Sequence, residues 1–242
     1  MKLVPHTGIA LQLAVLDGIP GRPNYPHGTH ILIRPDDDVL VATEAAYLWM
    51  DGNTAGNGPR WLRRHQASRL ADVPFRARLV LGAWRYTGSF ADLVAVDAQG
   101  RPVQRAASTG LYAQAEGKIF QEPEDPNQGL SVFAQIGYAS ERVNRFTRYT
   151  GGGWVYRGLF PGRSGDRLGF AIAVAFNGRP YEAAQSRSGR TVGRAEVDLE
   201  CTYQAPVTPW FALQGDVQYV EYRPYSTKFS SGSNPDPALV LS

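Results

Sequence analysis

The stretch that decides the fold reads VGRAEVDLECTYQ, residues 192–204. Polar and apolar side chains alternate along it without a break. Successive side chains of a β-strand point to opposite faces, so this segment has one apolar and one polar face. The apolar set is Ala195, Val197, Leu199, Cys201 and Tyr203, and the polar set is Arg194, Glu196, Asp198, Glu200, Thr202 and Gln204. The stretch predicts a strand that separates an apolar environment from a polar one.

The same period of two recurs along the chain. Residues 168–176, LGFAIAVAF, carry bulky apolar side chains on one face and only Gly and Ala on the other. Segments 9–15, 39–50, 75–86 and 209–219 alternate similarly, and weaker strand candidates lie at 29–34, 107–119, 129–139, 151–160 and 237–242. One short helix is expected, at 60–71. The pattern predicts an all-β, antiparallel fold of about ten or eleven strands that forms a single domain over residues 1–242.

The amino-acid composition is typical of a β-strand fold and excludes several classes of function. Among 242 residues, 26 Gly and 17 Pro supply frequent turns, and aromatics make up 11%. No window approaches the roughly 18 consecutive apolar residues of a membrane-spanning helix. A single cysteine, Cys201, excludes an internal disulfide and a cysteine-based metal site. All but three of the 25 basic residues are arginine, and they are spread among acids, which argues against nucleic-acid binding.

Alternation alone fits two architectures. A soluble sandwich buries its apolar face, whereas a membrane barrel turns that face to lipid and keeps the polar face toward a water-filled lumen. Aromatic residues near predicted strand ends, such as Trp84 and Tyr86 or Trp154 and Tyr156, are typical of interfacial girdles. Arginines opposed by carboxylates on the polar face also favour the barrel. So do connections that alternate in length: long loops are predicted at 52–73, 89–106, 140–150, 178–190 and 223–236, and short turns near 123–128, 161–167 and 205–208. The sequence therefore favours a transmembrane antiparallel β-barrel.

Several motifs resemble the carbohydrate-selective outer-membrane porins of the OprB family. The resemblance follows the chain in order and covers most of it. Its main segments are YRGLFPGR at 156–163, TYQAPVTPW at 202–210, and Asn234-Pro235 with ALVL at 238–241. Weaker matches lie at 14–18, 82–84 and 110–112.

This resemblance implies a sixteen-stranded barrel through which sugars diffuse passively across the outer membrane of a Gram-negative bacterium, without a cofactor. Small glucose-like sugars and outer-membrane lipid are the implied partners, and a homo-oligomer stays open. Family members carry strands ahead of this start and an aromatic residue at the end of the last strand, so the chain is expected to be a C-terminal portion truncated at both ends. An open sheet exposes unpaired edges to lipid, so such a portion should not conduct alone.

The polar faces supply the candidate pore-lining residues. Sugars need hydrogen-bond donors, acceptors and flat aromatic surfaces, and opposed charges on facing walls orient water and polar solutes. The predicted donors are arginines and the acceptors are carboxylates, with one tryptophan as a stacking surface. The candidates are Glu44, Arg76, Arg78, Trp84, Arg157, Arg194, Glu196, Asp198, Glu200 and Asp216.

Three other functions remain open at this stage. A soluble sugar-binding β-sandwich and a general, non-selective porin fit the same alternation. An outer-membrane hydrolase would use Glu196 and Glu200, but arginine neighbours are expected to keep both acids ionised and leave no proton donor. His27 and His30 have a spacing that suits a metal, yet no third ligand accompanies them. We therefore expect no catalytic residue and no metal.

Overall fold

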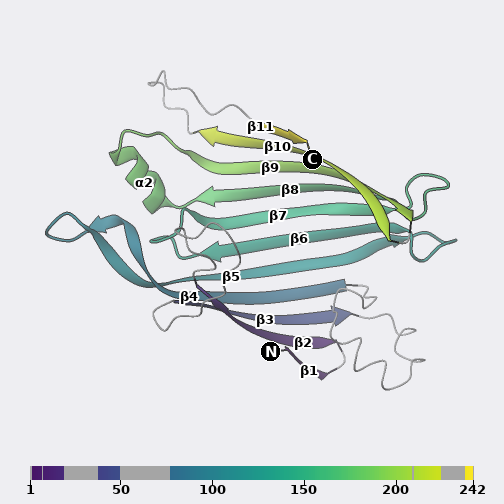
Figure 1. The fold of residues 1–242 in the computed structure, drawn as a ribbon, viewed down its shortest axis with the longest axis horizontal. Helices are drawn as coiled ribbons and strands as arrows, with labels where there is room; N and C mark the ends of the chain where they lie inside the picture. The colour runs from purple at the N-terminus through teal and green to yellow at the C-terminus, as the bar shows by residue number, and fades with distance from the viewer. Residues whose placement is uncertain are drawn as a thin grey trace.

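The computed structural model describes residues 2–6, 8–18, 38–49, 77–208, 210–224 and 238–241. Within them, eleven strands form one sheet in which each strand pairs with the next along the chain (Figure 1). Every pairing is antiparallel. The strands are β1 (Lys2–His6), β2 (Ile9–Asp17), β3 (Val39–Trp49), β4 (Ala77–Val96), β5 (Pro102–Gln121), β6 (Gly129–Ala139), β7 (Phe146–Arg157), β8 (Arg167–Asn177), β9 (Gly193–Thr208), β10 (Phe211–Pro224) and β11 (Ala238–Leu241). The predicted all-β antiparallel class is confirmed.

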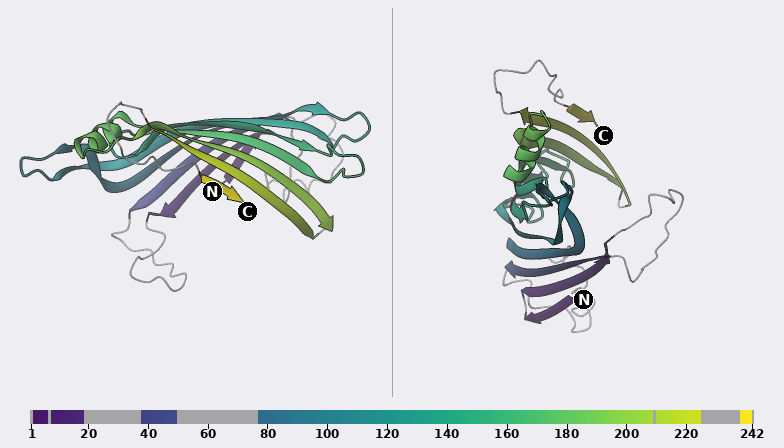
Figure 2. Two further views of the ribbon diagram at one scale, coloured as in Figure 1. Left: turned by 90° about the horizontal axis from the view of Figure 1, so that it is seen from above. Right: turned by 90° about the vertical axis from the view of Figure 1, so that its left-hand side faces the viewer.

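The sheet is curved into an open arc. Figure 2 shows the wall bending around one side, with β1 and β11 at its two ends. Neighbouring strands in a sheet twist against each other, and the accumulated twist curls a sheet of this width. Each strand is long enough to hold side chains in several rows across the wall. The arc therefore has a concave inner face and a convex outer face.

Strand register assigns each residue to a face. Partners in an antiparallel ladder point the same way. Leu81 pairs with Ala45 and Ala113, and Ile136 with Ala113 and Thr150. Leu81 is 57% exposed and Ile136 60% exposed, although both are large and apolar. By contrast Ala10, Ala46 and Val80, one position along from these rows, are buried. The apolar side chains thus gather on the outer face, as in a membrane barrel and not as in a sandwich.

The strands have two distinct ends. The turn end carries the connections 122–128, 158–166 and 209–210, and the loop end carries 97–101, 140–145 and 178–192. The expected alternation of long and short connections is not observed, because the loop-end connections 97–101 and 140–145 are shorter than the turn-end connections 122–128 and 158–166. The connection 50–76 joins β3 to β4 at the turn end, yet it is long, because β3 ends at Trp49 and β4 begins at Ala77. The turn predicted at 205–208 also lies further on, since β9 continues to Thr208.

The region 89–106, predicted as a loop, is instead a continuation of two strands. β4 and β5 each have 20 residues and run past the ends of their neighbours as a hairpin. Ala107 adopts a positive φ of 73°, and the register shifts between Tyr86 and Ser89 opposite it. This irregularity bends the hairpin where it leaves the wall. Likewise β7 begins at Phe146, within the loop expected at 140–150.

One helix, α2 (Arg179–Arg187), lies in the connection between β8 and β9, where the sequence predicted a loop. Proline stands in its first turn, Glu182 lies near its N-terminus and Arg187 in its last turn, all of which favour a helix. Arg187 Nη1 donates to the carbonyl of Val94 at 3.2 Å, so the helix contacts the β4–β5 hairpin.

Some predictions fall outside the described residues. These are the strand at 29–34, the helix at 60–71, and the site residues Arg76, His27 and His30. Among the helical residues that the structure describes, no segment has the length and hydropathy required to cross a membrane.

Candidate functional site: the polar inner face

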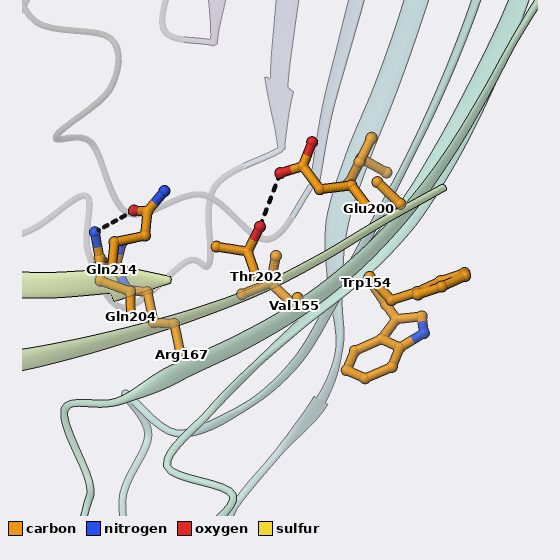
Figure 3. A pocket seen from close by; sticks show the side chains of 11 residues that line it. Trp154, Val155, Arg167, Glu200, Thr202, Gln204 and Gln214 are labelled. Carbon is orange, nitrogen blue, oxygen red and sulfur yellow. Dashed lines mark hydrogen bonds between the residues drawn. The ribbon is translucent and has the colours of Figure 1, made fainter. Parts of the chain in front are cut away.

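Register places the described candidate residues on one face. All lie at inner-face positions of the ladder, in strands that extend from β3 to β10: Glu44, Arg78, Trp84, Arg157, Arg194, Glu196, Asp198, Glu200 and Asp216. Figure 3 looks along the wall at this arrangement: Glu200 and Thr202 point to one side of the sheet and Trp154 to the other. The candidates are spread over the face as several clusters, each with its own partners.

The first cluster centres on Arg78 of β4. Its Nη1 donates to Glu116 Oε1 at 3.0 Å, and its Nη2 lies 4.0 Å from Glu44 Oε1. Tyr112 donates its hydroxyl proton to Glu44 Oε2 at 2.8 Å. One guanidinium is therefore held between two carboxylates, with its Nε buried and without a hydrogen-bond partner. Such a chain of charged hydrogen bonds fixes the orientation of every member.

The second cluster joins Glu196 of β9 to the loop end. Arg145 donates from Nη2 to Glu196 Oε2 at 3.2 Å and from Nε to Asn177 Oδ1 at 3.0 Å. Its guanidinium also lies 4.4 Å from the centre of the Phe146 ring and 5.4 Å from that of Tyr181 in α2. Asn177 in turn donates to the carbonyl of Gly193 at 2.6 Å. Arg145 thus connects the wall to the helix-bearing connection.

The third cluster links β9 and β10 with uncharged donors. Thr202 donates to Glu200 Oε1 at 2.8 Å, and Gln218 donates to Glu200 Oε2 at 3.1 Å. Gln204 Nε2 donates to Gln214 Oε1 at 3.1 Å (Figure 3), and Gln214 donates to Asp216 Oδ2 at 3.0 Å. The expectation of arginine neighbours therefore holds for Glu196, whereas the hydrogen bonds of Glu200 come from Thr202 and Gln218. Asp198 Oδ1, between them, is buried and has no hydrogen-bond partner.

Small residues form a shallow trough beside these acids. Five neighbouring inner-face positions of β7 and β8 are occupied by Gly151, Gly153, Gly169, Ala171 and Ala173. A hollow of about 330 Å³ lies here, and Phe133, Ala171 and Glu200 are among the residues that line it. The absence of side-chain bulk at these positions leaves room for water or solute along the wall.

Aromatic rings on the inner face lie over glycines of the neighbouring strand. Tyr112 of β5 covers Gly82 of β4, and Trp84 of β4 covers Gly110 of β5. A Cβ built on Gly82 would lie 2.1 Å from Tyr112 Cζ, and one built on Gly110 would lie 2.4 Å from Trp84 Cε2. Only glycine leaves space for a ring at these two points.

Four residues that complete the inner-face clusters were not among the predicted site residues. Tyr112, Glu116 and Arg145 are the nearest partners of predicted residues, and Arg167 lies beside Arg157 and Gln204 in register at the turn end. Tyr112 and Glu116 belong to the weakly alternating segment 107–119, and Arg145 to a predicted loop. Their polar character was visible in the sequence, but the contacts depend on register.

With this geometry in place, comparison with known proteins identifies the family. A family model described as "Carbohydrate-selective porin, OprB family" matches residues 1–241. The chain belongs to this family. OprB porins are outer-membrane proteins of Gram-negative bacteria, so the predicted location is confirmed. The family is one of channels, which favours transport over catalysis.

Individual relatives agree with the family. The chain is 24% identical over 157 residues to Porin B of Pseudomonas aeruginosa, a match that covers 56% of the chain and 35% of the relative. Among solved structures, the high-pH structure of Pseudomonas putida OprB has a TM-score of 0.69 at 20% identity over 90% of this chain and 52% of that one. The low-pH structure of the same protein has a TM-score of 0.43 at 18% identity.

The chain spans 35% of the length of the P. aeruginosa relative and 52% of that of the high-pH P. putida structure. The agreement with the high-pH structure confirms the porin fold of the sheet described above. The closure of the barrel with sixteen strands stays a prediction, as do the roles of the candidate pore-lining residues.

Proposed function

We propose that this chain forms part of the wall of an outer-membrane channel through which sugars diffuse passively. One observation carries the proposal: large apolar side chains are exposed on the convex face, while carboxylates, arginines and amides occupy the concave one. This inversion suits a wall between lipid and water. Membership of a family described as carbohydrate-selective supports sugars as the permeants.

The inner-face clusters have the chemistry that sugars require. Glu44 and Glu116 around Arg78 combine acceptors with a guanidinium donor, and the amides of Gln204, Gln214 and Gln218 supply neutral partners. Such groups exchange hydrogen bonds with hydroxyls as readily as with water, so a sugar passes without a large desolvation penalty. We propose the ten predicted residues, Arg76 included, as wall residues that face the permeant.

Liposome swelling tests this function with the protein isolated from the outer membrane of its host. A sugar-selective channel gives faster swelling with monosaccharides than with zwitterions of similar size. Equal rates would favour the general porin instead. A protein that partitions into the aqueous phase without detergent would contradict the membrane assignment and favour the soluble sugar-binding sandwich.

Current measurements test the role of the inner face. Replacing Glu200 by Gln removes a lumen carboxylate, so the reversal potential in a salt gradient should shift toward anion preference. Glu124→Gln is the matched control, because Glu124 lies exposed in the turn 122–128 and carries the same charge. Equal shifts of the reversal potential in both variants would mean that Glu200 does not line the channel. Enzymatic turnover of a glycoside that is lost in Glu196→Gln or Glu200→Gln would favour a hydrolase.

A further inference from the structure

Trp84 and Tyr112 pack against glycines of the inner wall. A Cβ added to Gly110 would lie 2.4, 2.4 and 2.5 Å from Trp84 Cε2, Nε1 and Cζ2, three adjoining atoms of one ring. One added to Gly82 would lie 2.1, 2.4 and 2.5 Å from Tyr112 Cζ, Cε1 and Oη. For each glycine the three nearest atoms all belong to the aromatic side chain of the neighbouring strand, so each ring packs directly against glycine backbone.

The two rings follow each other along the wall. Trp84 pairs with Gly110 and Gly82 pairs with Tyr112, so the rings occupy inner-face rows two residues apart. Two residues of a strand span about 7 Å, which is close to the width of one hexopyranose ring. Both side chains are half-buried, so part of each ring stays exposed on the inner face. We call these two side chains, one on β4 and one on β5, the aromatic strip.

Polar groups line one end of this strip. The Tyr112 hydroxyl donates to Glu44 Oε2 at 2.8 Å, which fixes the tilt of its ring. Gln12 pairs in register with Glu44, and Glu44 in turn with Gly82, so an amide and a carboxylate follow the tyrosine in one row. Arg78 and Glu116 lie four residues further toward the turn end and next to each other. Acceptors and donors thus stand beside a flat apolar surface.

We propose that Trp84 and Tyr112 form a stacking site that binds the apolar face of a pyranose sugar, with Glu44 and Gln12 bonded to its hydroxyls. The face of an aromatic ring is electron-rich and attracts the polarised C–H bonds that a pyranose presents on one side. An open-chain alditol has the same hydroxyls but no such flat face. The site therefore selects cyclic sugars over alditols. This inference rests on the proposed function.

A purely structural role for the rings is the main alternative. Aromatic side chains that cover glycines stabilise sheets, and both pairs fit that pattern. A stabilising role predicts lower stability but unchanged affinity for sugar in a variant that still folds. Binding is therefore measured directly, as the concentration of sugar that halves the ion current through single channels of the protein from its host membrane.

Glucose and sorbitol are the probes. Glucose should reduce the current at a lower concentration than sorbitol does. Trp84→Leu should raise the half-blocking glucose concentration roughly three- to tenfold, Trp84→Phe should restore most of the affinity, and the sorbitol response should not change. Gly110→Ala displaces the ring and should act like Trp84→Leu. Trp154→Leu, on the outer face, is the matched control and should leave glucose block unchanged.

The results distinguish a failure of the stacking site from a failure of the proposed transport function. Equal block by glucose and sorbitol, or unchanged glucose block in both Trp84→Leu and Gly110→Ala at normal conductance, would overturn the stacking site and leave sugar diffusion intact. A protein without conductance or sugar-dependent swelling would contradict the proposed function itself. If Trp84→Leu fails to assemble, Gly110→Ala tests the same prediction with the Trp84 ring still present but displaced.

Discussion

Asp92 of β4 and Arg105 of β5 face each other across the extended hairpin, and Arg105 Nε donates to Asp92 Oδ2 at 2.8 Å. The carboxylate is fully buried, accepts the backbone N–H groups of Val94 and Ala95 at 2.9 and 2.8 Å, and lies 3.7 Å from Arg142 Nη1. Leu93 N–H also bonds the carbonyl of Arg142 at 2.9 Å. One carboxylate thus ties the hairpin to the connection 140–145.

Asp92→Asn should loosen this hairpin without opening the wall. The amide keeps one acceptor but leaves Arg105 without its charged partner, which costs about 1–3 kcal/mol locally. Trypsin should therefore cleave after Arg105 several times faster. Asp97→Asn, at the exposed hairpin tip, is the control and should leave cleavage after Arg105 unchanged. Equal protection of Arg105 in all three proteins would contradict the assigned role of Asp92.

Acid should release the same contact. Hydrogen bonds from the backbone N–H groups of Ala95 and Val94, together with Arg105, lower the pKa of Asp92 from 3.8 to about 2. A carboxyl whose folded pKa lies below its unfolded value stabilises the fold above the unfolded value and loses that contribution as pH falls through the folded one. We expect about 2 kcal/mol to be lost between pH 4 and pH 2.

Pepsin digestion over pH 2–4 measures this loss, with rates normalised to an unfolded peptide. The hairpin of the unaltered protein should be cut slowly near pH 4 and as fast as that of Asp92→Asn near pH 2. The variant should show little dependence on pH over this range. A constant difference between the two proteins across the range would mean that Asp92 does not titrate there.

Cys201 offers a direct test of the two faces. It lies exposed on the outer face of β9, between Phe170 and Val217 in register, whereas Glu200 points inward. In membranes, Cys201 should react with an apolar maleimide and resist a charged, water-soluble thiol reagent. Glu200→Cys in a Cys201→Ser background should react with the charged reagent. The reverse pattern would mean that the apolar face is not in lipid.

Alternation was sufficient to predict which residues share a face. In 168–176 and 192–204, bulky and small or polar and apolar side chains differ so sharply that a shift of one residue would reverse every one of them. The weaker contrast at 89–106 hid the hairpin, because its anchoring residue, Asp92, is polar and buried by partners from three segments. The helix α2 was missed although Pro180 and Glu182 signal its start.

Contacts between side chains of different strands could not be predicted from the sequence. Gly82 and Tyr112 are separated by thirty positions in the chain, and nothing in either segment says that one lies against the other. The pairing follows from the register of β4 on β5, which the hairpin geometry beyond Tyr86 helps to set. The same holds for Glu116 beside Arg78. Residue type predicted the chemistry of the inner face, whereas register determines which groups act together.

Two glycines of the trough should respond differently to a methyl group. A Cβ at Gly153 would lie 2.2 Å from the carbonyl oxygen of Phe170, which is backbone of β8 and cannot move aside. At Gly169 the nearest atom would be 3.6 Å away, an ordinary contact. Gly153→Ala should therefore lower the free energy of unfolding by about 1–3 kcal/mol, and Gly169→Ala should change it little. Urea unfolding in detergent measures both, and equal losses would contradict the close packing of β7 on β8.

Ala107 is the residue where a methyl group should be removed. Its φ of 73° lies in the left-handed region, where a Cβ costs roughly 1 kcal/mol or more. Ala107→Gly relieves this strain but adds freedom to the unfolded chain, so the net gain in unfolding free energy should be about 0.5 kcal/mol. Ala106→Gly, at a neighbouring position where the structure records no positive φ, should instead lose about 0.5–1 kcal/mol. The two variants differ by one position and are expected to have opposite signs in the same urea titration. A loss in both would mean that Ala107 carries no strain, and the bend of the hairpin would then need another cause.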